Sequence, residues 1–90
     1  MLEISLAAGR KIRKIRRESG FSTSQLSILT GIPQQKLLRF ERGESRLHVD
    51  TLYQLCLFFD YDISVFFDDI YKELDFFHLQ MSASPKMEQL

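Results

Sequence analysis

The chain has 90 residues, of which 12 are Lys or Arg and 12 are Asp or Glu, so its formal net charge is zero. This length allows one small domain and leaves no room for a separate catalytic domain. A single cysteine excludes an internal disulfide framework. No apolar run reaches the ~18 residues that span a bilayer, and the first residues lack the pattern of a signal peptide. We therefore expect a soluble cytosolic protein with no membrane partner.

The charges are divided unevenly between the two halves of the chain. Residues 1–48 carry ten basic and four acidic side chains, a net charge of +6, whereas residues 49–90 carry a net charge of −6. This asymmetry favours a polyanionic partner for the first half. The alternative is a chance clustering of solvated charges.

Apolar residues recur every three or four positions through nearly the whole chain, which predicts an all-α fold of about five short helices. The first helix carries a cluster of basic side chains and ends at Gly20. Ser22 and Gln25 have the spacing of a capping box, which starts a second helix that ends at Thr30.

Three more helices follow along the chain. They cover about residues 33–42, residues 49–59 and a last segment that begins after Asp62, a suitable N-cap. The apolar spacing of this last helix continues to about Met81, and a polar tail follows.

The second and third helices, joined by a glycine-containing turn, have the pattern of a helix-turn-helix. We expect Leu26 and Leu29 to pack against Leu37 and Phe40, with the small Ser27 near the turn. Glutamine can bond adenine and arginine can bond guanine in the major groove, and an apolar side chain can contact a thymine methyl group. The third helix is predicted to expose a strip of such side chains: Gln34, Gln35, Leu38, Arg39 and Arg42.

One long segment, GRKIRKIRRESGFSTSQLSILTGIPQQKLLRFERG, resembles the Cro/CI-type (XRE) helix-turn-helix of phage repressors and many bacterial regulators. The likeness covers about residues 8–67. It implies a five-helix, lambda-repressor-like DNA-binding domain, to which the apolar spacing beyond residue 67 adds an extended C-terminal helix. The stretches FERGE, VDTL and ISVFF are also similar to small enterobacterial regulators encoded with fimbrial operons.

The resemblance implies roles for individual residues. Gln34, Gln35 and Arg39 match base-facing positions, and Arg16 and Glu41 match a buried ion pair between the first and third helices. The positions near DNA phosphates are Ser22, Thr23, Lys36, Arg42, Gly43, Arg46 and Arg10. In this set, Arg42 and Gly43 would offer backbone N–H groups.

The chain departs from the family pattern after Ser22. Many relatives have a glutamine there that contacts phosphate and braces the recognition helix, whereas this chain has Thr23. We therefore expect that contact to be shorter or absent.

Eight of the eleven aromatic residues lie between positions 58 and 77. We divide the chain into a helix-turn-helix domain (6–67), a helical extension (68–81) and a flexible tail (82–90). So many rings exceed what so small a domain can bury, which favours a homodimer surface. Its predicted members are apolar: Phe66, Phe67, Ile70, Tyr71, Leu74 and Phe77. The alternative is that the extension folds back over its own domain.

These features predict a sequence-specific transcriptional regulator that binds double-stranded DNA in the cytoplasm, in association with the nucleoid. It would act as a homodimeric repressor on an inverted repeat. The alternative is an antitoxin-like module that neutralises a second protein and regulates its own operon. Cys56 is expected in the core. Neither a spaced ligand set for a metal or cofactor nor a nucleophile–base pair for an enzyme is recognisable.

Overall fold

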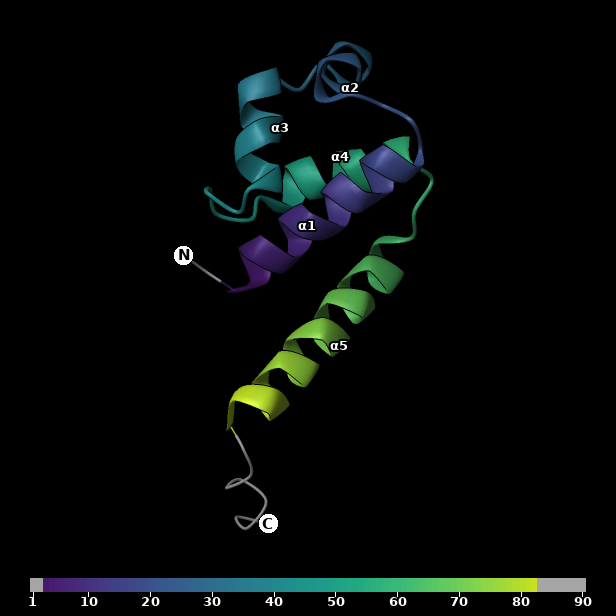
Figure 1. Cartoon of the computed structure of the whole chain (residues 1–90). Coiled ribbons are helices and arrows are strands. Elements are labelled where there is room, and N and C mark those ends of the chain that lie inside the picture. Colours follow the sequence, from purple (N-terminus) through teal and green to yellow (C-terminus); the bar gives the residue numbers. More distant parts are fainter. Residues whose placement is uncertain (1–2, 83–90) are drawn as a thin grey trace.

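The computed structural model describes the backbone of residues 3–82 and the side chains of residues 3–75. Its elements, in chain order, are α1 (Glu3–Glu18), α2 (Thr23–Thr30), α3 (Gln34–Glu41), α4 (Val49–Phe58) and α5 (Ile63–Ser82). In Figure 1, α1 lies between α3 and α5. The predicted all-α fold with a long final helix is confirmed. Of the predicted tail, residues 83–90 lie outside the described part of the chain.

Local side-chain interactions explain where α2 and α5 begin. The N–H of Gln25 donates to Ser22 Oγ at 3.0 Å, and the N–H of Ser22 donates to Gln25 Oε1 at 2.8 Å, which completes the predicted capping box. At α5, Asp62 Oδ1 accepts hydrogen bonds from the hydroxyl and the N–H of Ser64 at 2.7 and 2.8 Å. These bonds lower the pKa of Asp62. Both expected helix starts are confirmed.

All five helices contribute to one core. Its buried apolar side chains are Ala7, Ala8, Ile12, Leu26, Ile32, Leu37, Phe40, Leu52, Leu55, Cys56, Phe66 and Ile70. Leu29 is 58% exposed, so its predicted contact with α3 is wrong. The inner face of α2 is formed instead by Leu26 together with the half-buried Ser27 and Thr30. The Ser27 hydroxyl donates to the carbonyl of Ile32 at 2.6 Å, across the turn.

The helices α1 and α3 approach each other closely at Gly9. A Cβ atom at this position would lie 2.3 Å from the carbonyl oxygen of Phe40 and 2.8 Å from that of Glu41. Only a residue without a side chain fits between two helix backbones at this separation. Gly9 therefore fixes where α3 sits on α1.

Two residues assigned to a dimer surface lie inside this core. Phe66 and Ile70 are 0% and 1% exposed, because their spacing on α5 turns them inward. Their assignment to an interface between copies is wrong, and the folded-back alternative describes this part of α5. The domain boundary at residue 67 stays a prediction, although the shared core continues to Ile70.

The other members of the predicted dimer surface differ in exposure. Phe67 and Leu74 are half-buried against the core, whereas Tyr71 is 70% exposed. The side chain of Phe77 lies outside the described residues. Within the part of the chain that the structure describes, no helix is long and apolar enough to cross a membrane.

Several aromatic rings of the second half of the chain pack against other rings of the same chain. Phe21 and Phe58 lie 5.5 Å apart between ring centroids, and Phe58 and Phe59 lie 5.1 Å apart, both in edge-on arrangements. Tyr61 meets Phe66 in the same way at 6.1 Å. The expectation that the domain cannot accommodate so many rings is therefore wrong for Phe58, Phe59, Tyr61, Phe66 and Phe67, whereas Tyr71 is exposed. Edge-on pairs add stability beyond the area that they bury.

Candidate nucleic-acid interface

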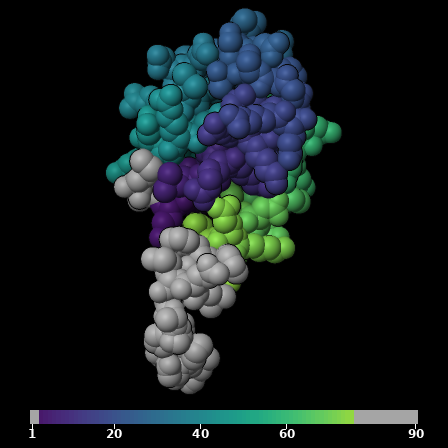
Figure 2. All heavy atoms as spheres, in the orientation of Figure 1, coloured from purple at the N-terminus to yellow at the C-terminus, as the bar shows by residue number. Residues whose placement is uncertain are grey.

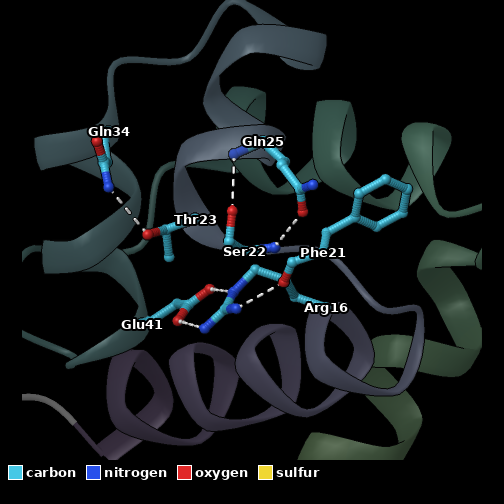
Figure 3. A network of polar contacts seen from close by, with 7 residues as sticks. All are labelled: Arg16, Phe21, Ser22, Thr23, Gln25, Gln34 and Glu41. Atoms are coloured by element: carbon cyan, nitrogen blue, oxygen red, sulfur yellow. Dashed lines mark hydrogen bonds and ion pairs between the residues drawn. The ribbon is translucent and has the colours of Figure 1, made fainter.

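A buried ion pair joins α1 to α3. Arg16 Nε and Nη2 donate to the two carboxylate oxygens of Glu41 at 2.6 and 2.8 Å, and the side chains are 10% and 5% exposed. Arg16 Nη1 also donates to the carbonyl of Phe21 at 2.8 Å, which ties down the segment entering α2 (Figure 3). The hydrogen bonds to Glu41 raise the pKa of Arg16. The structure brings this pair together as the resemblance implied.

One face of α3 is exposed and carries no negative charge. The inward face consists of Leu37, Phe40 and Glu41, and Glu41 is the helix's one acidic residue. The exposed amide and cationic side chains on or next to α3 are Gln34, Gln35, Lys36, Arg39 and Arg42. Leu38 is predicted to be exposed but is half-buried.

A groove of about 370 Å³ runs along one edge of this face, between α3 and α1. Leu38 and Arg42 line it on the α3 side, and Arg13 and Arg17 line it on the α1 side. Sequence reasoning did not single out Arg13 and Arg17. Their spacing of four residues, which places both on the same side of α1, could have identified them.

A second groove, of about 420 Å³, runs along the other edge of the face. Gln35, Lys36 and Arg39 line it together with Ser45 and His48 from the loop after α3. Arg46, in the same loop, is exposed. The exposed face of α3 is therefore bordered by cationic side chains on both sides.

The starts of α2 and α3 are braced against each other. Gln34 Nε2 donates to Thr23 Oγ1 at 3.1 Å (Figure 3). The recognition helix is therefore braced with the long amide from α3 and the short hydroxyl from α2, whereas the phosphate contact of Thr23, expected to be shorter or absent, stays a prediction. One N–H of Gln34 is thereby engaged. The side chain of the neighbouring Gln35 is exposed.

Two backbone N–H groups assigned to phosphates are used inside the chain. The N–H of Arg42 donates to the carbonyl of Leu38 at 3.1 Å, and that of Gly43 donates to the carbonyl of Phe40 at 3.0 Å. Gly43 is also buried. Their assignment to phosphates is wrong, because the end of α3 continues into a hydrogen-bonded turn. The exposed guanidinium of Arg42 is unaffected by this arrangement.

Two other predicted phosphate contacts are engaged within the chain. Ser22 is exposed, but its N–H and its Oγ take part in the capping box. The guanidinium of Arg10 pairs with Glu73 of α5. The structure therefore does not bring Arg10 together with the residues around α3.

A short helix with an exposed polar face, braced on the preceding helix across a glycine turn, defines a helix-turn-helix nucleic-acid-binding domain. Comparison with protein families agrees with this class. Residues 11–70 match the model of the Cro/C1-type HTH DNA-binding domain. The chain belongs to this family.

Three similar proteins come from archaea and are named as HTH-type transcriptional regulatory proteins. Over 52 residues, the chain is 36% identical to the protein of Thermococcus kodakarensis, 35% to that of Pyrococcus horikoshii and 31% to that of Pyrococcus furiosus. Each match covers 58% of this chain but 16% of the relative's length. No solved structure matches the chain.

Proposed function

We propose that this protein is a sequence-specific transcriptional regulator that reads double-stranded DNA with α3 in the major groove. The exposed face of α3 carries this proposal, because Gln35 and Arg39 lie one turn apart on it while Glu41 is buried and paired. A glutamine amide can bond adenine N6 and N7, and a guanidinium can bond guanine O6 and N7. The names of the archaeal relatives support the same function.

Cationic side chains around α3 would bind the DNA backbone. The exposed ones that border its face are Arg13, Arg17, Lys36, Arg42 and Arg46. Phosphate contacts supply affinity and orient the protein, whereas base contacts supply specificity. Because the proposed target is chromosomal DNA, we propose that the protein is located in the cytoplasm, in association with the nucleoid.

We further propose that the protein represses transcription as a homodimer on an inverted repeat. One recognition helix reads only a few base pairs, whereas two related by a two-fold axis read half-sites about 34 Å apart. Occupation of promoter DNA is sufficient for repression. An apolar stripe on α4 supports self-association, since Val49, Tyr53 and Leu57 are 61%, 53% and 62% exposed at a spacing of four residues.

Site selection from random duplexes, followed by affinity measurements on the selected site, tests the proposed reading residues. The variant Gln35→Ala/Arg39→Ala should lose at least about 30-fold in affinity for that site, because it removes two base contacts that contribute about 1–3 kcal/mol each. Lys72→Ala, which removes an exposed cation on α5, is the control and should keep the site preference. Unchanged preference in the double variant would contradict the assignment of α3 as the reading helix.

Light scattering tests the homodimer. Wild type should have twice the mass of one chain, and Tyr53→Glu/Leu57→Glu should have the mass of one chain with unchanged far-UV circular dichroism. Ile28→Glu alters an apolar side chain on α2 that is 79% exposed, and should leave the dimer intact. A monomeric wild type would exclude the homodimer, and a dimer that survives the α4 changes would exclude this stripe.

A further inference from the structure

The side of α1 that faces α5 is neutralised by carboxylates. Glu73 pairs with Arg10, and Asp69 Oδ2 lies 2.9 Å from Lys11 Nζ. Tyr61 donates its hydroxyl to the same oxygen of Asp69 at 2.9 Å. The acidic half of the chain is thus folded directly onto part of the basic half (Figure 2).

These contacts lie at one edge of a longer cationic stripe. Arg10, Arg13, Lys14 and Arg17 follow one another on α1 at helical spacing, and all four are exposed. They line an open groove of about 690 Å³ between α1 and α5. Arg13 and Arg17 also line the groove beside α3. The stripe is therefore continuous from the proposed reading helix to the carboxylates of α5.

We propose that α5 limits the DNA-binding surface by occupying the edge of this stripe. Glu73 takes the position at Arg10 that a DNA phosphate would otherwise take, and Asp69 does the same at Lys11. Phosphates then contact the stripe from Arg13 towards α3. This inference rests on the proposed function, because it assigns a competitor to the same DNA-binding surface.

The chemistry of the two anions explains the competition. Carboxylates and phosphates bind a guanidinium through the same N–H donors. A carboxylate on a docked helix is held at a high effective concentration, so DNA must displace it before it can reach Arg10. Its negative charge also repels an approaching phosphate. The contact between Arg10 and Glu73 therefore weakens DNA binding.

Glu73 offers the cleaner test of the two carboxylates. Its pair with Arg10 lies at the surface, with side chains 59% and 44% exposed, so the pair contributes little to folding. The Lys11 side chain is only 20% exposed, and the same contact also involves Tyr61. Substitution of Glu73 therefore changes the competition while the anchor of α5 is retained.

The experiment measures binding of a fluorescent random-sequence duplex by anisotropy over a series of NaCl concentrations. Glu73→Gln should bind about fivefold more tightly near 0.1 M salt, and its log–log salt slope should steepen by about 0.9 for one added phosphate contact. Asp75→Asn makes the same change in net charge on the same helix, but Asp75 does not line the groove. It should change affinity by less than about twofold, since exposed charges are screened.

Arg10→Gln supplies a test that does not depend on the stability of the Glu73 variant. Alone it should leave the salt slope unchanged, because Arg10 makes no phosphate contact in wild type, and in the Glu73→Gln background it should abolish the gain. A loss of salt slope in the single variant, or equal gains for Glu73→Gln and Asp75→Asn, would overturn the proposal. If wild type does not bind the duplex at all, the proposed function fails. Binding by wild type with no effect of Glu73→Gln refutes only the competition.

Discussion

Arg16 links the stability of the domain to the character of its exposed face. Its guanidinium makes two hydrogen bonds to Glu41 and one to the carbonyl of Phe21. These bonds compensate for the removal of the Arg16 and Glu41 charges from water. The same pair removes the one carboxylate of α3 from the surface that we propose to face DNA. The stability of the domain and the absence of negative charge on the exposed face of α3 therefore depend on the same ion pair.

Glu41→Ala should lower the free energy of unfolding by about 3–5 kcal/mol, because it leaves the buried charge of Arg16 unpaired. Urea denaturation followed by circular dichroism measures this loss. Glu44→Ala removes an exposed carboxylate three residues away and should change stability by less than about 0.5 kcal/mol. Similar small effects of the two substitutions would show that the pair is not structural.

Local interactions made much of this arrangement predictable from sequence. The capping box of α2 and the N-cap of α5 involve residues at most three positions apart, so their spacing is sufficient to identify them. The inward face of α3 follows in the same way from helical periodicity. Such features depend on the neighbouring residues and not on the rest of the fold.

Contacts between distant residues were not predictable in this way. The partner of Arg10 is 63 positions away, on a helix whose docking no local pattern reveals. Periodicity identified an apolar face on α5, but it did not distinguish a face buried in the chain's own core, as at Phe66, from one facing a second copy. The reversed brace between Thr23 and Gln34 depends on how two helices are oriented, which spacing alone does not give.

At the level of elements, the docking of α5 on α1 combines apolar and ionic contacts. Ile70 is buried, and Asp69 beside it bonds to Lys11 and Tyr61. Hydrogen bonds from Lys11, and to a smaller extent from Tyr61, lower the pKa of Asp69 below its ordinary value of 3.8. Burial acts to lower the pKa of Lys11, but its contacts with Tyr61 and Asp69 outweigh burial and raise it.

These shifts predict how the stability of the docked helix depends on pH. Because the folded state lowers the pKa of Asp69, its contribution is fully present above the ordinary value near 3.8 and is lost as the pH falls through the lower folded value. Wild type should therefore be more stable than Asp69→Asn at neutral pH, with a difference that shrinks below about pH 4. Thermal melts over this range measure it.

Asp68→Asn is the matched control for this titration. Asp68 forms a surface pair with Lys72 on the same helix, at 3.3 Å, with both side chains more than half exposed. Its substitution should change stability little at any pH, since such pairs contribute about 0.5 kcal/mol or less. A difference between wild type and Asp69→Asn that persists unchanged to low pH would contradict an ionic role for Asp69.

For the molecule as a whole, the zero net charge results from two halves of opposite sign that meet at α1. This helix contacts α3 on one side and α5 on the other. Its cations near α3 are proposed to face DNA, and those near α5 face carboxylates. Total charge is therefore a poor guide to how the protein meets a polyanion, whereas the distribution of charge over its surface is informative.

Arg13→Gln/Arg17→Gln should lower the log–log salt slope of DNA binding by about 1.8, because two phosphate contacts are removed. Lys72→Gln, on α5, should leave the slope unchanged. Anisotropy titrations at several salt concentrations measure both variants. An unchanged slope in the double variant would place these arginines outside the contact with DNA.

The close contact at Gly9 has a consequence for how the protein could acquire new targets. Because α3 packs backbone against backbone on α1 and is anchored by its inward side chains, the exposed Gln35 and Arg39 are not part of this contact. Gln35 and Arg39 can thus be exchanged without moving the helix that carries them. Under the proposed function, the fold can be conserved while the recognised DNA sequence changes, so that a new target sequence requires only a few replacements on the surface of α3.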